Sequence, residues 1–123
     1  MRGYGKELIL DLHHCDVIKF NRRALKGYFK LLCQKINMTP HKLCWWDDVG
    51  VPEGERQTDA KTKGTSAVQF IMESNVTVHT LELLGKVFVN IFSCKDFDVK
   101  VAAKFTKRWF GGEIVSSHVI ERL

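Results

Sequence analysis

The segment MESNVTVHT, residues 72–80, places a carboxylate, a hydroxyl and an imidazole close together in the chain. Glu73 is joined directly to Ser74, and His79 follows five positions later. A serine hydroxyl can attack the carbonyl that precedes its own nitrogen, and an ester then replaces the amide. This shift requires a strained backbone and a stabilised oxyanion. The chemistry open to this segment is therefore cleavage of the chain between Glu73 and Ser74.

Removal of the Ser74 Cα proton would complete such a cleavage, because the ester carboxylate then leaves and the remaining dehydroalanine hydrolyses to a pyruvoyl group. Histidine titrates near neutral pH, so His79 is the candidate base. Ser66 is a candidate hydrogen-bond partner for the oxyanion, and Cys94 is a candidate proton donor to the substrate carbon. A pyruvoyl group can form a Schiff base with a substrate amine and accept the electrons released with carbon dioxide.

Three strands are predicted around these residues, in segments 66–73, 75–83 and 86–94. The other expected elements are strands at 7–15, 42–47 and 113–122 and helices at 17–36 and 96–110. The order β-α-β-β-β-β-α-β predicts an α/β (α+β) two-layer sandwich, with two helices on one face of a mostly antiparallel sheet. The other face of the sheet would then need cover, which a partner subunit could supply.

The boundaries of the helices are indicated by capping residues. Asp16 is expected to cap the first helix, and Asp96 or Asp98 the second, because a short side-chain oxygen satisfies free backbone N–H groups. Gly111 is expected to end the second helix in a left-handed conformation. Segment 48–65 is rich in glycine and charge and predicts a long exposed loop, either solvated or acting as a lid over the site.

Length and composition indicate a single globular domain. The chain has 123 residues, of which 45% are hydrophobic, and no apolar run approaches the roughly 18 residues of a membrane span. No signal peptide is visible, so we expect a cytoplasmic protein without a membrane partner. The four cysteines form no C-x-x-C pair. No metal site is expected, because neighbouring strand residues such as His13, His14 and Cys15 point to opposite faces.

The formal net charge is +5, which allows binding to an acidic surface or to nucleic acid. The lysines and arginines are scattered over both predicted helices, the loop and the tail rather than forming one block with aromatics. The sequence therefore predicts no nucleic-acid partner. A basic nucleic-acid binder remains a rival interpretation, and it would show steeply salt-dependent association with DNA or RNA.

Residues 64–98, GTSAVQFIMESNVTVHTLELLGKVFVNIFSCKDFD, resemble the core of the short prokaryotic S-adenosylmethionine decarboxylases, which are pyruvoyl enzymes of the polyamine pathway. The family pattern is E-S-H-x-[ST]-x-H-T-W-P-E, then a strand ending F-[TS]-C-G. Without gaps, Glu73–Ser74 matches its self-cleavage site and His79 its processing histidine, while Cys94 and Ser66 match its catalytic cysteine and assisting serine. The resemblance covers most of the chain except loop 48–63, and the family's dimerising two-layer sandwich agrees with the predicted order of elements.

Some positions depart from the family pattern in ways that affect the expected substrate. Asn75 stands where the family has histidine, and Leu83 stands where it has the glutamate that holds the ribose hydroxyls. Glu82 lies one position away and is the candidate substrate-binding replacement, although it would face the opposite side of a regular strand unless a turn re-aims it. Trp45 or Trp46 is expected to replace the aromatic residue that stacks on adenine.

The resemblance thus implies a proenzyme that cleaves itself into chains 1–73 and 74–123, the second beginning with pyruvoyl, and that forms a homodimer of processed protomers. It implies a small-molecule substrate, S-adenosylmethionine, with ornithine or arginine as the alternatives because of Leu83. The rival from another class is a homologue that does not process and acts as an intact binding or regulatory subunit.

Overall fold

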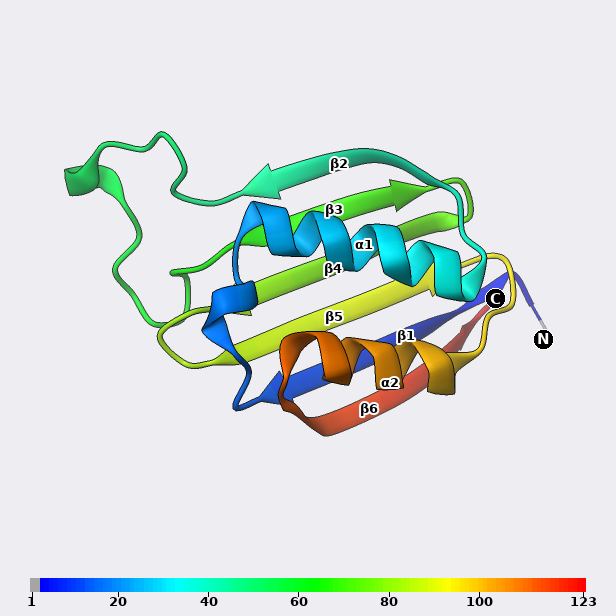
Figure 1. The fold of residues 1–123 in the computed structure, drawn as a ribbon. Helices are drawn as coiled ribbons and strands as arrows, with labels where there is room; N and C mark the ends of the chain where they lie inside the picture. The colour runs from blue at the N-terminus through cyan, green and yellow to red at the C-terminus, as the bar shows by residue number, and fades with distance from the viewer. Residues whose placement is uncertain (1–2) are drawn as a thin grey trace.

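The computed structural model describes residues 3–123, which form one six-stranded antiparallel sheet with two helices packed on one of its faces (Figure 1). The strands are β1 Gly5–His13, β2 Pro40–Trp46, β3 Ser66–Ile71, β4 Ser74–Leu81, β5 Lys86–Ser93 and β6 Glu113–Arg122. The helices are α1 Arg22–Ile36 and α2 Val99–Phe110, with short 3₁₀ turns η1 Val17–Lys19 and η2 Glu53–Glu55. The predicted fold class and order of elements are confirmed.

The strand order in the sheet is β2-β3-β4-β5-β1-β6, with every neighbouring pair antiparallel. The first strand of the sequence, β1, therefore lies between β5 and β6, the last two strands of the sequence. Side chains alternate between the faces, and those that face the helices form the core. Leu8, Leu10 and Leu12 of β1 are at most 1% exposed. The helices join above this core, where the Tyr28 and Thr106 hydroxyls lie 2.7 Å apart.

The helix boundaries were predicted partly correctly. Asp98 caps α2 by accepting hydrogen bonds from two backbone N–H groups, and Gly111 ends it with φ 66°, as expected. The first helix was predicted from residue 17, but α1 begins at Arg22. Asp16 caps only the 3₁₀ turn, while the extended backbone of Asn21 interrupts the helix and its side chain caps α1. No helix in residues 3–123 is long and apolar enough to cross a membrane.

The sheet face opposite the helices has no covering layer in residues 3–123 (Figure 1). Partly exposed aromatic and aliphatic side chains lie on it, among them Val68, Phe88 and Phe92. Trp46 and Phe70 are 72% and 45% exposed. Apolar surface of this kind is typical of an interface. The Ser66 and His79 side chains lie on the same face.

Candidate active site

The Glu73–Ser74 peptide bond lies at the tip of the β3–β4 hairpin. Ile71 and Ser74 pair across the two strands, which leaves only Met72 and Glu73 in the turn. Ser74 has a φ of 154°, a positive value that residues with a side chain rarely adopt. Such a conformation stores backbone strain where the surrounding structure holds it in place. The bond expected to break is therefore next to the strained residue.

Hydrogen bonds hold the carbonyl side of this peptide bond. The Cys94 backbone N–H donates to the Glu73 carbonyl oxygen over 2.9 Å. The Glu73 carboxylate in turn accepts from the Thr39 N–H over 3.0 Å. Attack on the Glu73 carbonyl carbon would place negative charge on the oxygen that already accepts a hydrogen bond from the Cys94 N–H. Sequence reasoning missed this donor, because a backbone group is not encoded by a residue type.

The hydroxyl of Ser74 is also held. The Asn75 side-chain amide donates to Ser74 Oγ over 3.2 Å. Since Oγ acts here as the acceptor, its own proton stays available for transfer. Asn75, the residue after the serine, thus makes a polar contact with Ser74 Oγ.

The second group of predicted residues forms a row across the sheet. In the strand registers Trp46 pairs with Ser66, Ser66 with His79, and His79 with Phe88. The Ser66 hydroxyl hydrogen-bonds His79 Nδ1. The imidazole lies nearly parallel to the Phe88 ring, with ring centroids 6.4 Å apart and an interplanar angle of 27°. His79 Nε2 makes no hydrogen bond within the described residues, and it offers a lone pair in the tautomer in which Nδ1–H donates to the Ser66 hydroxyl.

The two groups of residues lie at opposite ends of β4. His79 follows Ser74 by five residues, and a strand rises about 3.3 Å per residue, so ~16 Å of strand separates them. The fold brings Glu73, Ser74 and the Cys94 backbone together, and it brings Ser66 and His79 together. One protomer does not join the two groups.

A hollow of about 280 Å³ opens on the uncovered face beside Ser66 and His79. Trp46 and Phe88 form its aromatic walls, and Thr77 and Asn90 provide polar groups. An apolar recess with a few convergent polar groups suits the binding of a small molecule with a flat ring. The hollow and the row across the sheet therefore share the same side chains.

Trp45 lies on the other side of the strand from Trp46. It packs against the core under the helices, and the Arg22 guanidinium lies 5.6 Å from its ring centroid. Arg22 also forms a bidentate ion pair with Asp47, at 2.7 and 2.8 Å. The hydrogen bonds from Arg22 hold the pKa of the Asp47 carboxyl below its usual value. Both predicted stacking residues border the hollow, but only the Trp46 side chain lies on the uncovered face beside Ser66.

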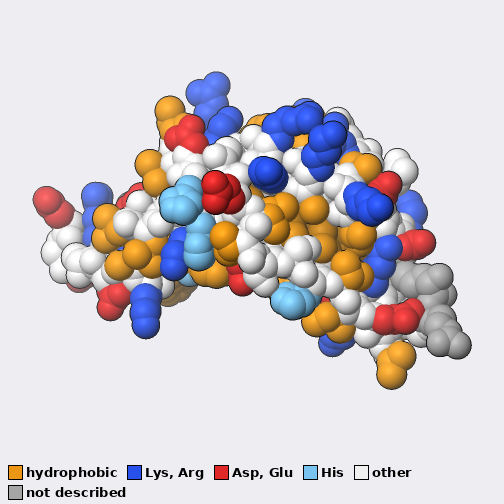
Figure 2. Space-filling model, turned by 90° about the horizontal axis from the view of Figure 1, so that it is seen from below, with side chains coloured by type: hydrophobic (Ala, Val, Ile, Leu, Met, Phe, Trp, Pro, Cys, Tyr) orange, Lys and Arg blue, Asp and Glu red, His pale blue; other side chains and the backbone are white. Residues whose placement is uncertain are grey.

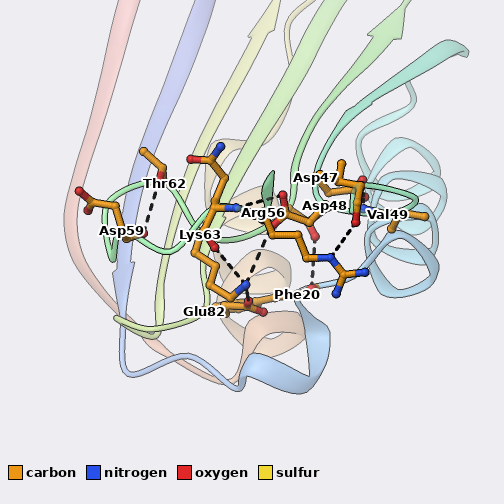
Figure 3. A network of polar contacts seen from close by, with 12 residues as sticks. Phe20, Asp47, Asp48, Val49, Arg56, Asp59, Thr62, Lys63 and Glu82 are labelled. Atoms are coloured by element: carbon orange, nitrogen blue, oxygen red, sulfur yellow. Dashed lines mark hydrogen bonds and ion pairs between the residues drawn. The ribbon is translucent and has the colours of Figure 1, made fainter. Parts of the chain in front are cut away.

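Glu82 belongs to a polar network at the base of loop 47–65 (Figure 3). Lys63 Nζ lies 3.5 Å from Glu82 Oε1 and 3.8 Å from Asp48 Oδ2, and it donates to the Gln57 carbonyl over 3.2 Å. The Asp48 carboxylate accepts from the Gln57 N–H. Glu82 is therefore engaged in holding the loop, and it does not line the hollow beside His79.

The thiols of Cys15 and Cys33 have a structural role. Burial raises the pKa of the Cys15 thiol and of the Cys33 thiol to about 11 in each case. Both therefore stay protonated at neutral pH and resemble small hydrophobes. Cys94 is half-buried beside the Glu73–Ser74 peptide bond. Residues 3–123 contain no group of three His, Cys, Asp or Glu side chains that could hold a metal ion.

Comparison with known proteins points to one family. The model of the S-adenosylmethionine decarboxylase family matches residues 6–123. The fold is similar to that in the crystal structure of the adenosylmethionine decarboxylase from Aquifex aeolicus, with a TM-score of 0.77 and 17% sequence identity. That alignment covers 99% of this chain and 92% of the Aquifex chain. No curated protein matches the sequence.

Proposed function

Because the chain belongs to the S-adenosylmethionine decarboxylase family, we propose that it is a proenzyme that cleaves itself between Glu73 and Ser74 and acts as a pyruvoyl-dependent decarboxylase in polyamine biosynthesis. The observation that carries this proposal is the hydrogen bond from the Cys94 N–H to the Glu73 carbonyl, next to a serine with a φ of 154°. A strained peptide whose carbonyl already faces a donor is prepared for attack by the neighbouring hydroxyl.

Cleavage begins when Ser74 Oγ bonds to the Glu73 carbonyl carbon. The carbon–nitrogen bond of the amide breaks, the Ser74 nitrogen takes the hydroxyl proton, and an ester joins the two halves. A base then removes the Ser74 Cα proton, the Oγ–Cβ bond breaks, and Glu73 leaves as a carboxylate. Tautomerisation and hydrolysis release ammonia, so that chain 1–73 ends at Glu73 and chain 74–123 begins with pyruvoyl.

The base in this scheme is His79 of a second copy. The ~16 Å between Ser74 and His79 on one strand is too long for proton transfer, which requires hydrogen-bond reach. A second copy, packed against the uncovered sheet face with its strands reversed, brings its Ser66–His79 pair to the Ser74 end of the first copy. The exposed aromatic side chains of that face support a homodimer with two such shared sites.

The pyruvoyl group supplies a carbonyl that binds the substrate amine and accepts the electron pair released with carbon dioxide. Cys94 lies beside the end at which this group forms, and its thiol returns a proton to the substrate carbon. Ser66 fixes the orientation of the His79 ring through Nδ1. Trp46 and Phe88 line the recess for the remainder of the substrate.

S-adenosylmethionine is the proposed substrate, because the aromatic recess beside His79 fits a purine ring. Leu83 is 57% exposed and offers no hydrogen bond to ribose, and Glu82 is already engaged with Lys63. These two residues keep ornithine and arginine as alternative substrates. Release of carbon dioxide from the three compounds, measured in parallel, tests this choice. Release from ornithine or arginine alone would replace the proposed substrate.

The rival is an intact homologue that binds a ligand without processing. The separation of Ser74 from His79 within one protomer favours this rival if the protein is monomeric. Denaturing electrophoresis with intact mass measurement separates the two functions. We expect two fragments, with the second lighter by one ammonia than a simple hydrolysis product, and a single 14.2 kDa chain for Ser74→Ala. A native protein that stays at 14.2 kDa would support the rival.

A further inference from the structure

The helix layer carries positive charge that the proposed reaction does not use. Helices α1 and α2 contain nine of the 19 lysines and arginines and none of the 14 aspartates and glutamates. The rest of the chain therefore carries ten basic and 14 acidic side chains. The excess of positive charge in the whole protein comes from the two helices. Their basic residues are Arg22, Arg23, Lys26, Lys30, Lys35, Lys100, Lys104, Lys107 and Arg108.

These cations form rows along the outer side of the helices. Arg22, Lys26 and Lys30 recur at every fourth residue of α1, and Lys100, Lys104 and Arg108 do so in α2. Side chains four residues apart lie on one side of a helix, about 6 Å apart. All nine basic residues are exposed. The two helices pack side by side on the same face of the sheet, and seen from the β6 side the Lys and Arg side chains gather along that layer (Figure 2).

Few of these charges are neutralised within the protein. Arg22 pairs with Asp47, and Lys35 lies 5.4 Å from the centroid of the Phe105 ring. The other seven form no ion pair within the described residues. Like charges four residues apart destabilise a helix, and so do cations in its first turn, where both α1 and α2 lack an acidic residue. A bound polyanion would relieve both effects.

We propose that the outer surface of α1 and α2 is a docking site for duplex nucleic acid, bound through its phosphodiester backbone without reading of bases. Linear rows of cations match a linear polyanion. Helix α1 is ~22 Å long and spans about six base pairs of a duplex. The sequence predicted no such partner because the cations are scattered along the chain, but the fold gathers them on one surface.

An anionic bilayer fits this surface less well. Binding at a membrane interface requires an apolar face that enters the lipid. The large apolar side chains exposed on the helices are Leu31 and Val101, at only 38% and 39%, and the apolar faces of both helices point into the core. The surface is therefore suited to electrostatic contact with phosphates rather than to insertion.

The test is binding of the full-length protein to labelled duplex RNA and duplex DNA over a series of salt concentrations. With about four phosphates neutralised, the affinity falls by about 10² between 50 and 200 mM salt. Lys30→Gln combined with Lys104→Gln is expected to weaken binding and to reduce the slope of log affinity against log salt by about 1.8. Glutamine is a good helix former, so both helices are preserved.

Lys42→Gln combined with Lys61→Gln is the matched control, because it removes the same charge from exposed sites outside the helices. This control is expected to bind like the native protein. Equal weakening by the two pairs of substitutions would overturn the proposal, since it would show attraction to net charge alone. No association at 50 mM salt, or binding to phosphatidylglycerol vesicles but not to a duplex, would also overturn it. Self-cleavage, followed in the same variants, is expected to be unchanged.

Discussion

The two ends of the β3–β4 hairpin carry different parts of the proposed chemistry. At the tip, Glu73 and Ser74 form a strained peptide whose carbonyl and hydroxyl are both hydrogen-bonded. At the opposite end, Ser66 and His79 form a pair beside an aromatic recess. For the proposed reaction, the tip supplies the nucleophile and the oxyanion donor but no base, and the other end supplies the base but no bond to be cleaved. Under the proposed reaction, one protomer therefore holds two half-sites, and neither is complete by itself.

The largest effect on the rate of self-cleavage is expected from removal of the proposed base, His79. His79→Ala should slow self-cleavage by about 10²–10⁴, the usual contribution of a positioned general base. The rate is measured as the appearance of the 74–123 fragment over time. A variant that is cleaved at the native rate would remove His79 from the account. Val78→Ala, one residue away but directed into the core, controls for disturbance of the strand.

A substitution at Cys94 is expected to affect the rate of decarboxylation but not the rate of self-cleavage. Cys94→Ala keeps the backbone N–H that faces the Glu73 carbonyl, so cleavage should continue at close to the native rate. Loss of the thiol should lower the rate of carbon dioxide release by about 10², or direct the proton to another atom of the intermediate. Both rates can be measured on one preparation. If cleavage stops while the fold is intact, the thiol rather than the N–H stabilises the oxyanion.

A smaller effect is expected at Asn75. Asn75→Ala removes one hydrogen bond to Ser74 Oγ, worth about 1 kcal/mol, and should slow cleavage about five-fold. Asn75→His places the residue type of the family pattern there and should restore most of the rate. Failure of the histidine variant to exceed the alanine variant would assign Asn75 no role in holding the hydroxyl.

The smallest effect concerns stability at the end of β2. Arg22 lowers the pKa of Asp47, so the pair stabilises the fold above the unfolded pKa of about 3.9, and this stabilisation disappears as the pH falls through the lower folded value. Asp47→Asn should therefore lower the Tm at pH 7 and flatten its decrease below pH 4. Thermal unfolding at several pH values checks both. An unchanged pH profile would show that the pair contributes nothing.

The fold was predictable from the sequence because periodicity, caps and turn residues agree. Alternation in 75–83 and the Asp98 and Gly111 caps gave the correct elements. The predicted start of α1 was wrong because two capping residues lie close together. The sequence pattern does not show that the helical segment capped by Asp16 ends within one turn.

The site was less predictable because closeness in sequence is not closeness in space. Five residues in a helix would put His79 within ~8 Å of Ser74, whereas a strand puts it ~16 Å away. The choice between Trp45 and Trp46 depends on which face of β2 each occupies, and pairing with β3 decides this. The Cys94 N–H and the basic helix surface arise from the folded backbone and from packing, so neither is visible as a motif.

Co-expression of two inactive chains tests most directly whether the half-sites meet across a dimer. A His79→Ala chain keeps Ser74, and a Ser74→Ala chain keeps His79. Intact mass spectrometry of the mixture should show the His79→Ala chain cleaved at a rate well above that of the same chain alone, with the Ser74→Ala chain whole. A His79→Ala chain that remains as slow in the mixture as alone, although mixed dimers form, would contradict the shared site.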